Sequence, residues 1–74
     1  MDGHYSMVIE WSDEDQAYLV TLPEWADRVK MPCADGETYE DAARVGAEVL
    51  DELLYLADQK YIERPIPRVY ATAS

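Results

Sequence analysis

The stretch Gly36-Glu37-Thr38-Tyr39-Glu40-Asp41 decides the fold, because it marks the start of the longest regular pattern in the chain. Thr38 and Asp41 form the Thr-x-x-Asp pattern of a capping box, in which a side chain at the helix start accepts a backbone hydrogen bond. The acidic side chains here also complement the positive end of a helix dipole. From Tyr39 to about Lys60 the sequence has no proline and one glycine, so it predicts a single long helix.

The predicted helix has one apolar face and one acidic face on a wheel of 100° per residue. The apolar stripe consists of Tyr39, Ala42, Ala43, Gly46, Val49, Leu50, Leu53 and Ala57. The opposite face consists of Glu40, Asp41, Arg44, Glu48, Asp51, Glu52, Tyr55 and Asp58. Val45 and Leu56 extend the apolar side at one margin, and Ala47 and Leu54 extend it at the other, giving an arc of about 200°. A helix on one sheet needs a stripe of about 100° or somewhat more, so the surplus predicts a homo-oligomer, a dimer or larger, with Val45, Leu54 or Leu56 in the contact.

Two predicted strands precede the helix. Residues 5–11 alternate in polarity, with Tyr5, Met7, Ile9 and Trp11 on the apolar side. Residues 17–22 are rich in strand-forming side chains, and the polar residues 12–16 between the two segments favour a turn. The pattern therefore predicts a β-hairpin.

A third strand is expected at residues 29–34, where Pro32 restricts it to an edge or a bulge. Trp25 lies in a predicted loop between the second and third strands. After the helix, Pro65-Ile66-Pro67 favours extended backbone, and residues 68–71 are expected to add a short final strand. The element order β-β-β-α-β predicts one α+β domain spanning residues 1–74, with an antiparallel three-stranded sheet packed in two layers against one long amphipathic helix.

Composition limits the possible partners and locations. A chain of 74 residues forms one small domain that buries only about 60% of its unfolded surface. Its net charge of −10 repels nucleic acid and anionic membranes and attracts a basic protein. No apolar stretch reaches about 20 residues, so we expect no membrane span. The N-terminus lacks a basic region followed by an apolar run, so we expect a cytoplasmic protein.

The sequence does not favour a cofactor or metal site. Cys33 is the only cysteine and His4 the only histidine, so neither a disulfide nor a cysteine-based zinc site can form within the chain. The acidic run Asp13-Glu14-Asp15 does not fit a calcium-binding EF-hand loop, because Tyr18 stands where that loop requires glycine. We therefore expect no cofactor and no bound metal.

A metal-dependent nuclease is the enzymatic alternative, because carboxylates are abundant. Such a site needs several carboxylates that converge on metal ions. The helical acidic residues are predicted to face away from the sheet, and they cannot reach Glu10 without burying charge. We therefore expect the protein not to be an enzyme.

The acidic face of the helix is the candidate partner-binding site, with Glu48, Asp51, Glu52 and Tyr55 at its centre. Six acidic residues and one basic residue occupy positions 40–59, so few ion pairs within the helix can balance this charge. An exposed aromatic side chain such as Tyr55 is typical of an interface. The alternative is a charged face that serves only to keep the helix solvated.

Several motifs, taken together in their order and spacing, resemble the HicB-like antitoxins. They are Tyr5-x-x-Val8-Ile9-Glu10-Trp11, the acidic turn, Tyr18-Leu19-Val20-Thr21-Leu22-Pro23, Gly36-Glu37-Thr38-Tyr39-Glu40-Asp41-Ala42 and Pro65-Ile66-Pro67. The resemblance covers roughly residues 5–67. It implies a partial ribonuclease-H-like fold without nuclease activity, and a partner: a small basic HicA-type toxin that cleaves mRNA and is neutralised by the antitoxin.

The resemblance has one departure. Many full-length HicB proteins carry a C-terminal helix-turn-helix or ribbon-helix-helix domain that binds the operator, whereas this sequence ends at Ser74. We therefore expect a stand-alone HicB-like domain that binds no DNA or RNA by itself. The alternative reading is an orphan oligomeric interaction module with another partner.

Overall fold

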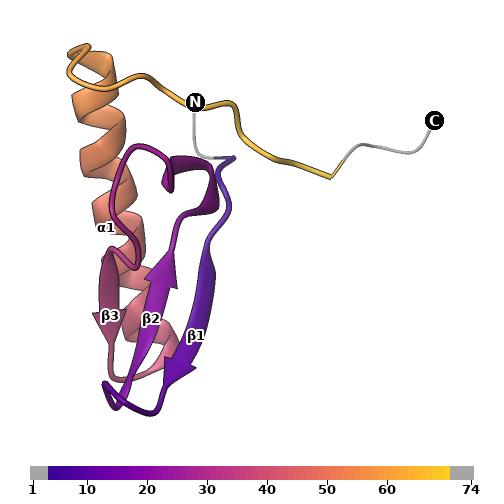
Figure 1. Ribbon diagram of the computed structural model, residues 1–74, viewed down its shortest axis with the longest axis vertical. Helices are drawn as coiled ribbons and strands as arrows, with labels where there is room; N and C mark the ends of the chain where they lie inside the picture. The colour runs from indigo at the N-terminus through magenta and orange to yellow at the C-terminus, as the bar shows by residue number, and fades with distance from the viewer. Residues whose placement is uncertain (1–3, 71–74) are drawn as a thin grey trace.

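The chain begins with an antiparallel hairpin in the computed structural model, which describes residues 4–70 (Figure 1). Its strands are β1 (Val8–Ser12) and β2 (Ala17–Thr21), paired from Val8 opposite Thr21 to Ser12 opposite Ala17. The connecting turn is polar, and Gln16 adopts a left-handed conformation with φ of 52°. The predicted hairpin is confirmed, although β1 begins three residues later than the predicted strand.

The third strand lies closer to the helix than the sequence suggested. β3 (Ala34–Gly36) pairs antiparallel with β2, so the sheet order is β1-β2-β3 and β2 is central. The prediction of a strand at residues 29–34 was wrong except at its last residue. The backbone N–H of Val29 donates to the carbonyl of Trp25 at 2.9 Å in a turn, and Pro32 has no N–H to donate to a strand ladder.

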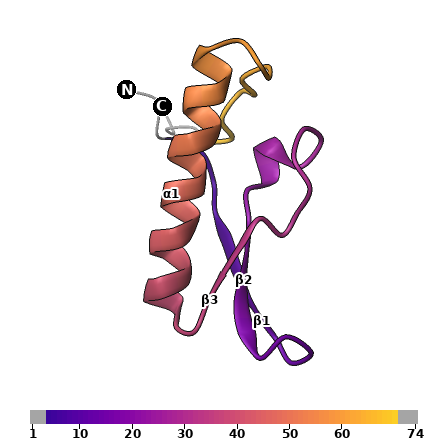
Figure 2. The same cartoon turned by 90° about the vertical axis from the view of Figure 1, so that its left-hand side faces the viewer.

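The predicted long helix is confirmed as α1 (Tyr39–Asp58), which covers one face of the sheet in a second layer (Figure 2). Thr38 caps its start, because the Thr38 hydroxyl accepts a hydrogen bond from the backbone N–H of Asp41 at 3.0 Å. The helix ends two residues before the predicted limit, and Lys60 turns the chain with a φ of 67°. Within residues 4–70, no helix is long and apolar enough to cross a membrane.

Gly36 allows the first turn of α1 to rest directly on the sheet. A Cβ atom at this position would lie 2.4 Å from the backbone nitrogen of Ala42 and 2.7 Å from its Cα. Both contacts are with backbone atoms, which cannot rotate aside. Because Gly36 has no side chain, β3 and the start of the helix can approach each other this closely.

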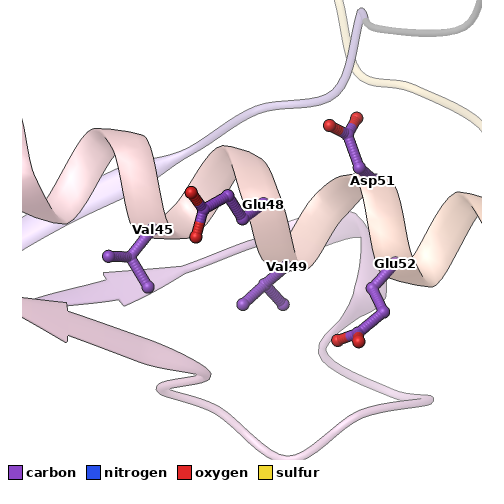
Figure 3. Close-up of a pocket in the computed structure, with 5 residues that line it drawn as sticks. All are labelled: Val45, Glu48, Val49, Asp51 and Glu52. Carbon is purple, nitrogen blue, oxygen red and sulfur yellow. The ribbon is translucent and has the colours of Figure 1, made fainter.

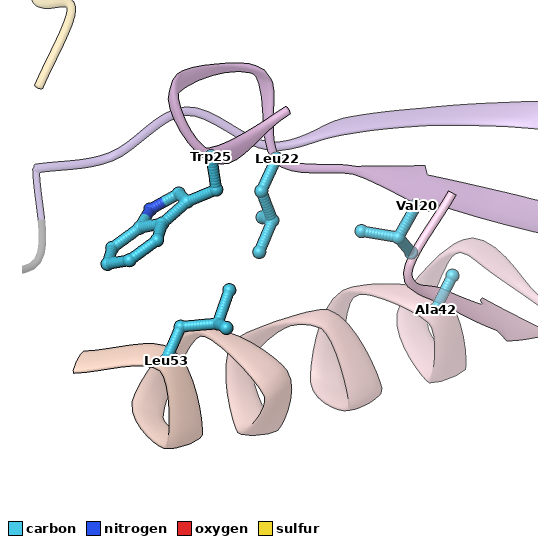
Figure 4. Close-up of a cluster of buried hydrophobic side chains, with 5 residues drawn as sticks. All are labelled: Val20, Leu22, Trp25, Ala42 and Leu53. Carbon is cyan, nitrogen blue, oxygen red and sulfur yellow. The ribbon is translucent and has the colours of Figure 1, made fainter. Parts of the chain in front are cut away.

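The core lies between the sheet and the helix and is centred on side chains from three elements (Figure 4). Its buried residues are Val20 in β2, Leu22 directly after β2, Trp25 in the 3-10 helix η1 (Pro23–Trp25), and Ala42 and Leu53 in α1. Val20 and Leu22 are two residues apart, so the alternation of the extended chain directs both toward the helix. Trp25, predicted only as a loop residue, is fully buried and fills the end of the core.

The C-terminal segment is extended but does not join the sheet. Residues 63–70 contain no strand, so the predicted final strand at 68–71 is not formed by its described part, and Ala71 lies outside the described residues. The Tyr5 hydroxyl donates to the carbonyl of Pro65 at 2.6 Å, and the backbone N–H of Arg68 donates to Glu24 at 2.8 Å. These hydrogen bonds hold the segment beside the start of the chain. Because the backbone N–H of Arg68 donates to Glu24, it is not available to pair with a neighbouring strand.

Candidate partner-binding surface

The outer face of α1 presents the four residues that the sequence predicted as partner-binding: Glu48, Asp51, Glu52 and Tyr55. Their spacing of three or four residues places them on one side of the helix, and all four are exposed. The Tyr55 side chain is 62% exposed, although it is large and mostly apolar. The structure therefore brings these residues together on a continuous surface.

The charge of this surface is only partly balanced within the helix. Arg44 lies 3.3 Å from a carboxylate oxygen of Asp41 and 3.9 Å from one of Glu48. Both pairs are exposed, and exposed ion pairs contribute little to stability. Within residues 4–70, Asp51 and Glu52 form no ion pair. The middle of the face thus retains net negative charge.

An open depression of about 470 Å³ lies along this part of α1 (Figure 3). It is lined by Val45, Glu48, Val49, Asp51 and Glu52. In the view of Figure 3, Val45, Val49 and Glu52 point toward the lower margin of this outer face and Asp51 points toward its upper margin. The depression therefore combines an apolar strip with carboxylates at its border, a combination that fits the stem and head of a basic side chain.

The three residues predicted to form the oligomer contact do not lie on one patch. Val45 and Leu56 share one margin of the helix, whereas Leu54 lies at the opposite margin and packs against the core. All three are half-buried. Of these three residues, Val45 and Leu56 therefore remain available for an additional apolar contact at one margin of α1.

Glu24 is a buried carboxylate that sequence reasoning missed. It is 8% exposed and accepts hydrogen bonds from the backbone N–H and the hydroxyl of Ser6, each at 3.0 Å, and from the backbone N–H of Arg68 at 2.8 Å. Burial alone would raise its pKa, but the hydrogen bonds from Arg68 and Ser6 outweigh burial and hold the pKa below its usual value. Glu24 therefore joins three chain segments and has a structural role.

Two aromatic residues of the predicted apolar faces remain exposed to solvent. Trp11 and Tyr39 were assigned to the apolar sides of a strand and of the helix, yet their side chains are 48% and 61% exposed. Both contact Tyr18, which is half-buried between them. We refer to Trp11, Tyr18 and Tyr39 as the aromatic cluster.

The remaining candidate groups are the thiol of Cys33 and the side chains that could bind a metal ion. Cys33 is half-buried, its backbone N–H donates to the carbonyl of Val20 at 2.9 Å, and burial raises the pKa of its thiol. A raised pKa keeps the thiol protonated and unreactive at neutral pH. In the part of the chain that the structure describes, no three His, Cys, Asp or Glu side chains are grouped to hold a metal ion.

No protein-family model, curated protein or solved structure matches this chain.

Proposed function

We propose that this protein is a HicB-like antitoxin domain that binds and neutralises a small basic HicA-type mRNA-cleaving toxin. The observation that carries the proposal is the outer face of α1, where Asp51 and Glu52 lack ion pairs within residues 4–70 and lie beside the exposed Tyr55. The three antiparallel strands followed by one helix are compatible with the partial ribonuclease-H-like fold that the family resemblance implies. The proposal includes that fold relationship and a cytoplasmic location.

Inhibition would follow from competition for a basic surface. An enzyme that cleaves RNA needs positive charge to hold phosphates. A partner with a net charge of −10 is attracted to the same surface and associates faster because of the long-range field. The antitoxin itself needs no catalytic residue, because occupying the RNA-binding surface is sufficient to stop cleavage.

An orphan oligomeric interaction module is the second candidate function. The half-buried margin of Val45 and Leu56 favours it, because that margin borders the depression on α1 and offers apolar surface to another copy. The neighbouring gene separates the two functions. A small basic reading frame of toxin type supports the antitoxin, and its absence supports the orphan module.

Surface plasmon resonance with an immobilised HicA-type toxin tests the proposed surface. Replacing Asp51 and Glu52 by Lys should slow association and flatten its salt dependence, because exposed charges act mainly on the association rate. The Tyr55→Ala variant should instead speed dissociation, because truncating an interface aromatic typically costs about 2 kcal/mol or more.

The matched control replaces Glu10 and Asp35 by Lys. Both residues pair with Leu19 in one row of the sheet, on the face opposite to the buried Val20 and therefore away from α1. This control changes the net charge by the same amount and should slow association less. Equal slowing by both double variants would show that only the overall charge matters, and unchanged kinetics in all variants would reject this surface.

A further inference from the structure

The aromatic cluster joins three side chains from two strands and the helix. The rings of Tyr18 and Tyr39 are tilted by 35° with centroids 4.2 Å apart. The ring of Trp11 meets Tyr18 edge-on, with centroids 5.1 Å apart and planes at 67°. The edge-on pair of Trp11 and Tyr18 falls within the favourable range of about 4.5–7 Å between ring centroids, and the Tyr18 and Tyr39 rings are packed slightly closer than that range. The three rings therefore form one contiguous cluster.

The sheet register explains why this cluster is exposed. Trp11 on β1, Tyr18 on β2 and Gly36 on β3 form one row across the sheet. The first turn of α1 rests on Gly36, at one end of this row. Tyr39 in that turn reaches Tyr18, and Trp11 at the opposite edge remains 48% exposed. The cluster is therefore an aromatic surface that the helix leaves partly uncovered.

The surroundings of the cluster are acidic, and one acid holds Trp11 in place. The indole N–H of Trp11 donates to the carboxylate of Asp13 at 2.9 Å. Neither the segment 11–18 nor the segment 36–41 contains a basic residue, and together they carry six acidic ones. Because its ring is already held, Trp11 would lose little freedom on contact with a partner.

We propose that the aromatic cluster is a docking site for arginine side chains of a basic partner protein. A guanidinium group stacks on aromatic faces and also pairs with carboxylates, and both kinds of group are present here. Lysine fits less well, because its ammonium group is compact, strongly hydrated and unable to stack. This site rests on the proposed function for its basic partner and adds a second contact region, at the start of α1 and one end of the sheet.

Calorimetric titration of the full chain with short homopeptides of arginine and of lysine, equal in length, tests this site. We expect the arginine peptide to bind several-fold more tightly. Trp11→Leu and Tyr39→Leu keep apolar bulk but remove a ring, and each should weaken arginine binding by about two- to fivefold. Trp11→Phe and Tyr39→Phe retain a ring and should preserve most of the affinity.

Tyr61→Leu provides the matched control, because Tyr61 is 77% exposed and outside the cluster. It should leave arginine binding unchanged, and thermal unfolding of each variant shows whether it is folded. Equal affinity for the two peptides would overturn the proposal. Folded Trp11→Leu and Tyr39→Leu variants that bind the arginine peptide like the original chain would overturn it as well.

The same variants separate this inference from the proposed function. If the helix-face lysine variants weaken toxin binding and the cluster variants do not, the cluster is not part of the interface. If the cluster selects arginine but no HicA-type toxin binds the chain, the proposed function fails and the arginine site stands.

Discussion

The carboxylate of Glu24 accepts a hydrogen bond of 2.8 Å from the backbone N–H of Arg68, which lies 44 residues further along the chain. The same carboxylate binds Ser6, so one side chain ties the beginning of the chain to its C-terminal segment. We refer to these hydrogen bonds of Glu24 as the tie. In a domain this small, the tie contributes stability that a larger hydrophobic core would otherwise provide.

We expect Glu24→Gln to lower the free energy of unfolding by about 1–3 kcal/mol. The NH2 group of glutamine would replace one carboxylate oxygen, and it cannot accept the hydrogen bond that a backbone N–H donates there. Urea denaturation measures this change. Glu14→Gln is the control, because Glu14 is exposed in the hairpin turn and its substitution should change stability by less than about 0.5 kcal/mol. Equal effects of the two substitutions would show that the tie does not stabilise the domain.

The tie should also depend on pH. The pKa of Glu24 is lowered in the folded chain, so its ionised form stabilises the fold above the usual glutamate pKa of about 4.3. That contribution is lost as the pH falls through the lower pKa of the folded state. The difference in unfolding free energy between the original chain and Glu24→Gln should therefore stay constant near neutral pH and shrink as the pH falls below the usual value of about 4.3. A difference that does not shrink below this value would contradict the assigned role.

The two glycines at the interface between sheet and helix should respond differently to alanine. Gly36→Ala places a Cβ atom 2.4 Å from backbone atoms of the helix start and should cost about 1–3 kcal/mol or more. Gly46→Ala meets side-chain atoms of Val20 at 2.9 Å and of Met7 at 3.0 Å. Met7 can move and alanine gains about 1 kcal/mol of helix propensity over glycine, but the buried, β-branched Val20 must also shift. The net loss at Gly46 should therefore be smaller than at Gly36 but still measurable. Thermal unfolding of both variants decides this, and equal losses would contradict the close approach at Gly36.

Self-association should depend on the margin of Val45 and Leu56. We expect sedimentation equilibrium at micromolar concentration to show a dimer or larger species, and Val45→Glu or Leu56→Glu to shift it toward the monomer mass of 8.5 kDa. Ala47→Glu is the control, because Ala47 is exposed on the opposite margin. An original chain that sediments only as a monomer would reject the oligomer.

Local patterns were sufficient to predict the hairpin and the helix, because alternation and helical spacing report directly on which side chains face the core. They also placed Glu48, Asp51, Glu52 and Tyr55 on an exposed face. The third strand was predicted too early in the sequence, at residues 29–34. Val29 instead belongs to a turn that begins at Trp25, and no pattern in the sequence indicates that turn.

The features that the sequence alone could not predict, the burial of Glu24 and the exposure of Trp11, depend on contacts between distant segments. Glu24 receives its hydrogen bonds from residues 18 and 44 positions away, so nothing in its own segment marks it as buried. The exposure of Trp11 depends on where the helix crosses the sheet, and Gly36 sets that crossing. The sequence shows the glycine but does not show which backbone approaches it.

Inhibition of mRNA cleavage tests the central claim most directly. A purified HicA-type toxin is incubated with mRNA and increasing amounts of this protein, and intact mRNA is measured. We expect cleavage to stop near equimolar protein, and the variant with Asp51 and Glu52 replaced by Lys to require a clear excess. Undiminished cleavage at a large molar excess of the original chain would contradict its role as an antitoxin.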